Sequence, residues 1–357
     1  MSHAVLRGKA TKAQTYLDGI LEAVLASKHG KDIRNVGLSE ILLYSMNANR
    51  SGIYMINGST NESITNEQIL KMAVPIARTL IAKGYSGKHV MMILRNDEYM
   101  AAVYYGLIFS GAIPILIDPN STIYEFTHFN TLVGPRLIFC EQKKVEDITE
   151  ILNAGNINKP EIVVADSNAI HKFTKSVSSN IDDFRTHHTR FPKPTDTAML
   201  VSTAQWMTHT CLMTACPVYQ ITLLMTPTPT IDCLLYMIRR HKPTWALLGP
   251  TFANTLATAA SSDDLASLET VLTTGAKPGP DIMKSLKRKL PKNVNLCNGY
   301  GTTETHGFIT IPANDTPFES NGNILNIFEF KLCNESVEEV GKNEQGQLYL
   351  RSELYIS

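Results

Sequence analysis

The feature that most constrains the fold is a repeated alternation between short apolar runs and longer segments with helical character. Apolar runs over His89–Leu94, Ile113–Asp118 and Arg136–Glu141 are separated by segments that end at Gly111 and Leu132. Short, continuously apolar runs predict strands that are buried on both faces. Parallel strands need a crossover between them, which is usually a helix. The first half of the chain therefore predicts a mostly parallel α/β sheet.

Helix boundary signals support this prediction. Thr65 and Gln68 have the spacing of a capping box, and the helix that follows is expected to kink near Pro75 and to end at Gly84. Asn96 is expected to cap the helix that follows the first parallel strand.

The same alternation resumes after a polar stretch over residues 176–194. Strands are expected at Ala198–Thr203, Gln220–Thr226, Thr244–Gly249, Thr270–Gly275 and Asn293–Asn298, and helices at Ile231–His241 and Asp281–Leu290. After Glu304 the pattern changes to short alternating strands at Phe308–Ile311, Asn326–Cys333 and Gly346–Arg351, which are typical of the start of an antiparallel barrel. We expect three parts: two α/β subdomains, at residues 1–195 and 196–305, and a partial β-barrel at 306–357.

Charge and cysteine content limit the classes of function. The chain has 33 basic and 33 acidic residues, so no broad basic surface argues for a nucleic-acid partner. Residues 197–231 contain no Lys, Arg, Asp or Glu, and this run exceeds the roughly 20 residues of a membrane span. Its prolines and threonines favour a buried strand, helix and strand instead. The six cysteines form no CxxC pair and predict buried free thiols rather than disulfides or a zinc site.

The run Asn293–Asn298 leads into a segment whose side chains suit a nucleotide. Tyr300 offers a ring for stacking, and Gly301 lets the backbone approach a ligand closely. Thr302 and Thr303 can donate hydrogen bonds to phosphate oxygens, and Glu304 can hold a hard cation such as Mg²⁺. The expected metal ligand, Glu304, therefore directly follows the expected phosphate donors in the sequence.

A second feature is the absence of glycine between Gly155 and Gly249, although the chain has 21 glycines. Loops that wrap phosphates bring backbone N–H groups close to the ligand and depend on glycine for positive φ angles. Neither a Gly-x-Gly-x-x-Gly nor a Gly-Lys-Ser/Thr element occurs in this region. The sequence therefore predicts that no glycine-rich phosphate loop is present there.

The segment from Asn298 to Glu304 resembles the NxYGxTE signature of the AMP-forming acyl-CoA synthetases, the superfamily that includes firefly luciferase and the coumarate–CoA ligases. Five further family-like elements occur in the family's order, at Gly111–Pro119, Pro135–Cys140, Thr244–Thr251, Thr273–Pro278 and Gly346–Ser352. The resemblance covers nearly the whole chain, and the agreement of six elements makes it specific.

This resemblance implies a fold, a reaction and a set of site residues. The implied fold is a layered α/β large domain with two mostly parallel sheets and packed helices, followed by a β-barrel. The implied reaction joins a carboxylate to ATP to give an acyl-adenylate, and then passes the acyl group to coenzyme A. By position, the implied residues are Gly275, Ala276, Tyr300, Gly301 and Thr302 for the adenine nucleotide, Thr303 for the α-phosphate, Glu304 for Mg²⁺, and Trp206, Trp245 and Gly249 for the acyl pocket.

The chain also departs from the family pattern. Gln205-Trp206 stands where the family has an aromatic–histidine pair, and Thr274 replaces the first glycine of the adenine element. The sequence ends at Ser357, before the family's ribose-binding aspartate and the small C-terminal domain with its lysine, both of which we expect to be absent. Each lost group of this kind costs roughly 2–4 kcal/mol of transition-state stabilisation.

We therefore expect an AMP-dependent acid–CoA ligase-like protein whose activity on a fatty or aromatic acid is lost or severely reduced, that is, a pseudoenzyme. The alternatives are a non-catalytic protein that binds acyl chains or a partner, and a shortened form of an active ligase. The expected location is the cytoplasm, because there is no apolar signal-peptide core and no C-terminal signal of the SKL type that would match peroxisomal relatives.

Overall fold

The computed structural model describes residue 19 and residues 37–154, 159–181, 197–305, 307–312, 316–317, 320–325 and 327–352. They form two compact units. The first unit comprises Met1–Asp196, Thr203–Gln205 and Leu212–Thr228, and the second comprises Thr197–Ser202, Trp206–Cys211 and Pro229–Ser357. The structure thus divides the chain in two, and the three expected ranges stay a prediction. The polar stretch at 182–196 lies outside the described residues.

The first unit contains a four-stranded parallel sheet in the order β4-β3-β5-β6. Strand β3 (His89–Ile93) lies between β4 (Ile113–Leu116) and β5 (Leu137–Cys140), and β6 (Glu161–Val164) extends the sheet beyond β5. The three strands predicted in this part of the chain are confirmed. The fourth was not predicted, because Glu161–Val164 holds only three apolar residues next to a charged one.

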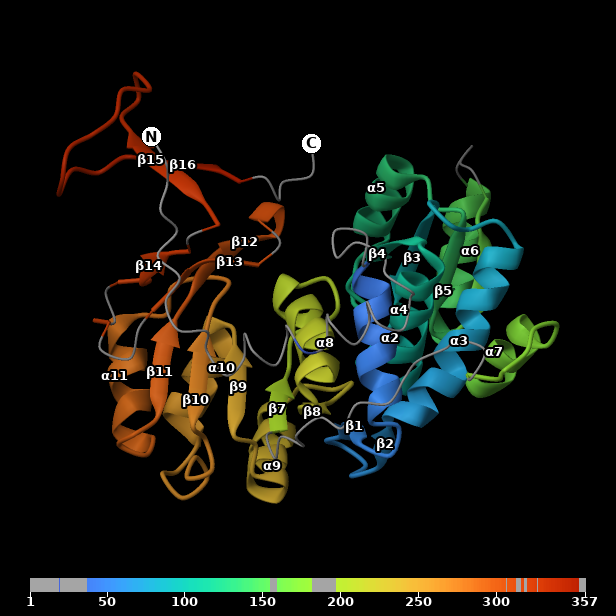
Figure 1. The fold of residues 1–357 in the computed structure, drawn as a ribbon, viewed down its shortest axis with the longest axis horizontal. Helices are drawn as coiled ribbons and strands as arrows, with labels where there is room; N and C mark the ends of the chain where they lie inside the picture. The colour runs from blue at the N-terminus through green and yellow to red at the C-terminus, as the bar shows by residue number, and fades with distance from the viewer. Residues whose placement is uncertain are drawn as a thin grey trace. The chain divides into compact units, whose positions relative to one another are not determined.

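Helices cover both faces of this sheet (Figure 1). Alternate residues of β3 and β5 pack with α5 (Ile123–Val133) and α6 (Val145–Ala154) in one apolar core cluster. Phe139 of β5 points to the other face, where its ring contacts Phe173 of α7 (Ser167–Thr174), with 5.6 Å between the ring centroids. Helix α7 in turn packs on α3 (Asn66–Ala82).

The helix signals of the first unit are confirmed with one correction. The Thr65 hydroxyl accepts a hydrogen bond from the Gln68 backbone N–H, and the Gln68 side-chain oxygen accepts one from the Thr65 backbone N–H. Pro75 lies inside α3. The cap of α4 (Glu98–Ser110), however, is Asp97 and not Asn96. The Asp97 carboxylate accepts the Met100 N–H at 2.8 Å, which an aspartate does as well as an asparagine.

Three further strands belong to the first unit, with β1 (Ile53–Asn57) between an antiparallel β2 (Ser63–Thr65) and a parallel β8 (Thr222–Met225). Helix α2 (Leu38–Ala48) precedes them. The uncharged run at 197–231 forms strand β7 (Thr197–Leu200), helix α8 (Met207–Tyr219) and strand β8, as predicted. In the described part of the chain, no helix is both long and apolar enough to cross a membrane.

The second unit contains parallel strands in the order β11-β10-β9-β7. Strands β9 (Trp245–Leu248), β10 (Thr270–Thr273) and β11 (Asn295–Asn298) pair in register along their whole length. Helices α9 (Ile231–His241), α10 (Pro250–Ala259) and α11 (Pro280–Lys289) connect these strands. All four strands and the first and last of these helices were predicted, to within a few residues.

The chain then becomes antiparallel, as expected. Strand β13 (Gly307–Ile311) lies between β12 (Tyr300–Thr302) and β14 (Asn323–Ile324), and β15 (Glu329–Cys333) pairs with β16 (Gln347–Arg351). The described residues form these two small sheets, and closure into a barrel stays a prediction. All six cysteines are free, and four of them are buried, namely Cys140, Cys216, Cys297 and Cys333.

Candidate functional site

The candidate site lies at the carboxyl edge of β9, β10 and β11 in the second unit. The last residues of the three strands, Leu248, Thr273 and Asn298, lie side by side in register. The segments that follow therefore leave the sheet at one edge, and the antiparallel strands β12 and β13 begin beside it (Figure 1). Ligands of open parallel sheets usually bind at this edge, since loops there can meet above the strand ends.

Gly275 supplies an open backbone surface at this edge. Its φ is +89°, a left-handed conformation that favours glycine, and a Cβ built on it would meet no atom within 4 Å. Ala276 is exposed beside it. Thr274, which stands where the resembling family has glycine, is buried and donates its N–H to the Leu248 carbonyl. Its side chain is therefore directed into the protein and leaves the space above Gly275 free.

Tyr300 is the first residue of β12, two residues after the end of β11, and has 40% of its surface exposed. Its backbone is fixed by pairing with Thr310 in β13. Below it, the Thr273 hydroxyl donates to the Asn298 amide oxygen at 2.9 Å, and the Asn298 amide nitrogen donates to Asn321 at 2.7 Å. This buried network fixes the start of the segment that carries Tyr300. The sequence singled out the tyrosine but not these supporting residues.

Glu304 and Thr303 lie exposed on the 3₁₀ turn η3 (Thr303–Thr305) that follows β12. Thr305 fixes this turn, since its hydroxyl accepts the Thr302 N–H at 3.2 Å and donates to the Thr302 carbonyl. The pKa of Glu304 is lowered by hydrogen bonds from its own backbone N–H and from the Thr302 hydroxyl. The Glu304 side chain is therefore a carboxylate at neutral pH, which is the donor that Mg²⁺ prefers.

Gly301 is the most tightly packed glycine of the site. A Cβ built on it would lie 2.1 Å from the carbonyl oxygen of Gly307, across the β12–β13 pair. Here glycine is required by the close approach of two backbones, and the approach of a ligand to Gly301 stays a prediction.

The three residues expected in an acyl pocket do not all come together. Gly249 follows β9 at the carboxyl edge, and Trp206 precedes α8 with 56% of its surface exposed. Trp245 is the first residue of β9 and lies opposite Thr270, at the amino end of the sheet. A strand rises about 3.3 Å per residue, so Trp245 lies roughly 10 Å from the edge that carries Gly249.

His209 is a further residue near the end of β7, and sequence analysis gave it no role. Its Nδ1 lies 2.9 Å from the Ser202 carbonyl oxygen, and the ring is fully buried. Burial lowers the pKa of His209 to about 4, despite the opposing hydrogen bond to Ser202. The ring is therefore neutral, with Nδ1–H as the donor. Its Nε2 has no hydrogen-bond partner in the part of the chain that the structure describes.

Comparisons with known proteins identify the family of the chain. Residues 46–204 and 171–356 match the sequence pattern of the AMP-binding enzyme family. The chain belongs to this family. The 4-coumarate–CoA ligase 3 of Arabidopsis thaliana is 25% identical over 84% of this chain, and that of Oryza sativa subsp. japonica is 23% identical over the same share. The chain spans 63% of the length of each of these relatives.

Solved structures of the family share the fold. The luciferase-like enzyme from the nonluminescent mealworm Zophobas morio has a TM-score of 0.78 at 20% identity, with 89% of this chain and 86% of that one covered. An anthranilate CoA ligase in complex with anthranoyl-AMP has a TM-score of 0.77 at 18% identity, covering 90% and 69%. These likenesses confirm the α/β fold of the family's large N-terminal domain.

The residues present fit an adenine nucleotide with one metal ion. The open space above Gly275 and the half-exposed ring of Tyr300 suit a flat base, and Glu304 supplies a single carboxylate. In the described residues there is no cluster of three or more His, Cys, Asp or Glu side chains that could hold a metal by itself. A metal at Glu304 would thus depend on phosphate oxygens for its other ligands, which is common for Mg²⁺.

Proposed function

We propose that the carboxyl edge of β9, β10 and β11 binds an adenine nucleotide. The observation that supports this proposal is that Gly275 follows β10 and Tyr300 follows β11 where these strands end side by side, with Glu304 on the turn after β12. The Tyr300 ring offers a stacking face, and Gly275 and Ala276 present backbone to the base. Gly301 and Thr302 hold the strand that positions the ring. The Thr303 hydroxyl donates to the α-phosphate.

Glu304 holds Mg²⁺ in this proposal, together with phosphate oxygens of the nucleotide. The ion would neutralise charge on the phosphates during transfer. The carboxylate is exposed on the turn after β12 and is therefore accessible to an ion.

The proposed reaction class is that of an AMP-forming acid–CoA ligase. A carboxylate oxygen of the substrate bonds to the α-phosphorus of ATP, and pyrophosphate leaves. The thiolate of coenzyme A then attacks the acyl carbon, and AMP leaves. Membership of the family, the two coumarate–CoA ligase relatives and the neighbour named for its anthranoyl-AMP complex support this class. The proposed substrate is a fatty or aromatic acid, with Trp206 and Gly249 beside its acyl part.

We further propose that catalysis is severely reduced. The support is the glycine-free stretch between Gly155 and Gly249, where the family places its phosphate loop. The family pattern also matches the chain as two separate segments, which overlap at residues 171–204, and not as one continuous match. Removing one preorganised donor from a transition state costs about 10²–10³ in rate, and a whole loop supplies several donors.

Two measurements on the chain test the proposal. Calorimetric titration with AMP should show saturable binding that is lost in Tyr300→Ala. It should be retained in Tyr124→Ala, a matched control because Tyr124 is 81% exposed on α5 of the first unit. Carboxylate-dependent exchange of pyrophosphate into ATP should stay at background.

The two arms can fail separately. No saturable AMP binding up to about 10 mM would refute the nucleotide site. Exchange at a rate of about 1 per second or faster would refute the reduced activity while leaving the site intact. Binding without exchange is the outcome that we expect, and it would also agree with a non-catalytic binding role.

A further inference from the structure

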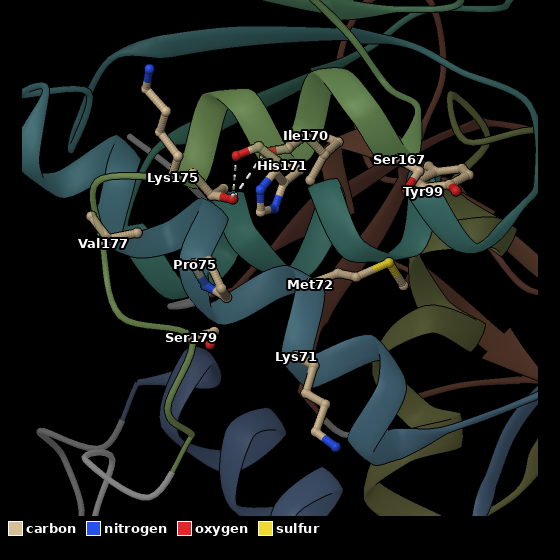
Figure 2. A pocket seen from close by; sticks show the side chains of 11 residues that line it. Lys71, Met72, Pro75, Tyr99, Ser167, Ile170, His171, Lys175, Val177 and Ser179 are labelled. Atoms are coloured by element: carbon tan, nitrogen blue, oxygen red, sulfur yellow. Dashed lines mark hydrogen bonds between the residues drawn. The ribbon is translucent and has the colours of Figure 1, made fainter.

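A cavity of about 320 Å³ opens between α3 and α7 of the first unit, and all of its lining residues belong to that unit. Helix α3 contributes Lys71, Met72 and Pro75 to its wall. Helix α7 and the turn after it contribute His171 and Lys175. Figure 2 shows the His171 ring directed from α7 toward Pro75, between the two helices. The volume is at the lower end of the range for small-molecule pockets.

The two helices that form the cavity are held together beside it. The Nζ of Lys83, the residue directly after α3, lies 4.8 Å from the centre of the Phe173 ring on α7. The Arg78 guanidinium of α3 donates to the Ser178 carbonyl of the turn after α7. Pro75 has no N–H, so it cannot donate to the Lys71 carbonyl one turn earlier, and an apolar ring faces the cavity there. The cavity therefore lies between two helices that are in direct contact beside it.

The lining carries basic groups and no carboxylate. It includes two lysines and a histidine but neither Asp nor Glu. Lys71 forms an ion pair with Glu67 at 3.0 Å. The side chains of His171 and Lys175 have no ion pair or hydrogen bond to any residue in the described ranges. The His171 ring is thus available as a donor inside the cavity, whereas Figure 2 shows the Lys175 amine directed away from it, so the flexible lysine side chain has to rotate to reach a ligand there.

The rest of the wall combines hydrocarbon surface from Met72, Pro75, Ile170 and Val177 with the hydroxyl residues Ser167, Thr174 and Ser179. The Thr174 hydroxyl already donates to the Ile170 carbonyl at 2.9 Å. Tyr99 and Ser167 lie side by side at one end of the cavity (Figure 2). A ligand that matches both features carries a negative group at one end and a hydrocarbon body behind it.

We propose that this cavity binds a small carboxylate with an aliphatic body, with His171 and Lys175 as donors to the carboxylate. Nothing in this site depends on the proposed nucleotide site, whose residues all belong to the second unit. Because both donors are partly in water, each contributes a modest part of the affinity, and binding in the millimolar range is expected.

The test uses octanoate as the probe and the Met72 methyl group as the reporter. The full chain is labelled with ¹³C at the methionine methyl groups, and the Met72 signal is assigned by its loss in Met72→Leu. Octanoate should shift this signal saturably. His171→Gln and Lys175→Gln should each weaken the binding about two- to fivefold. Lys172→Gln, a charge removal on the same helix outside the cavity lining, should leave it unchanged.

Octan-1-ol separates a carboxylate site from a merely apolar one. It has the same chain length without the charge, so it should shift the Met72 signal far less at equal concentration. The proposal is overturned by an absent Met72 shift at about 10 mM octanoate, by equal shifts with the alcohol, or by unchanged affinity in both charge variants. Tyr300→Ala, which tests the nucleotide site, should not alter the Met72 response.

Discussion

Gly301→Ala tests the closeness of the β12–β13 pair that positions the candidate site. The added Cβ would lie 2.1 Å from the Gly307 carbonyl oxygen and 2.9 Å from the Phe308 Cα. A carbon normally approaches a carbonyl oxygen to about 3.3 Å, so the strands must separate by about 1 Å. Both partners are backbone, so no side-chain rotation can relieve the contact.

The expected cost follows from this geometry. Overpacking of a rigid site costs about 1–3 kcal/mol, and a backbone clash belongs at the upper end of that range. A loss of about 2 kcal/mol lowers the melting temperature of a chain of this size by roughly 2–3 °C. Alternatively the pair opens locally, in which case Tyr300 moves and AMP binding weakens while the melting temperature falls less.

Gly249→Ala is the matched control. Gly249 lies at the same sheet edge with a φ of −74°, and its added Cβ would meet no atom within 4 Å. Its melting temperature, measured by differential scanning calorimetry, should fall by no more than about 1 °C, because the expected cost is limited to the poorer N-cap propensity of alanine, roughly 0.5–1 kcal/mol. If Gly301→Ala has the same melting temperature and AMP affinity as Gly249→Ala, the inferred close packing of β12 on β13 would be refuted.

Two further predictions concern the first unit. Burial raises the pKa of Asp97 to about 6 despite its hydrogen bond from Met100. Its folded pKa is thus above the unfolded one, so its contribution to stability is complete below 3.8 and is lost as the pH rises through about 6. Asp97→Asn keeps a capping oxygen but cannot ionise. Its free energy of unfolding relative to the wild type, measured with denaturant, should therefore rise by on the order of 2 kcal/mol between pH 4 and pH 7, and a constant difference would contradict this. Thr65→Ala should cost about 1 kcal/mol of unfolding free energy in the same assay, whereas Thr131→Ala, exposed within α5, should cost nothing, and equal costs would argue against the capping box.

Much of the fold could be predicted because its signals are local. Strands β3, β9 and β10 are short apolar runs, and each is buried between helices, so composition alone indicates their type. Thr65 and Gln68 form their capping box from residues three apart. The signals were weaker where few apolar residues follow one another. Strand β6 and helix α10 were missed for this reason.

The candidate site was predictable in its residues but not in its support. Tyr300 and Glu304 are chemically distinctive, so a motif identifies them. The Asn298 network joins three strands or loops that are more than 20 residues apart, and no local pattern carries that information. Trp245 is a residue for which the motif alone was insufficient. The sequence assigned its ring to the acyl pocket, whereas the register of β9 places the residue at the amino end of the sheet. In a parallel sheet, ligands bind near the carboxyl ends of the strands. A sequence predicts that a strand exists more accurately than it predicts where that strand begins and ends. For that reason the variants that best test this site are those, such as Gly301→Ala, whose effect depends on register and not on residue type.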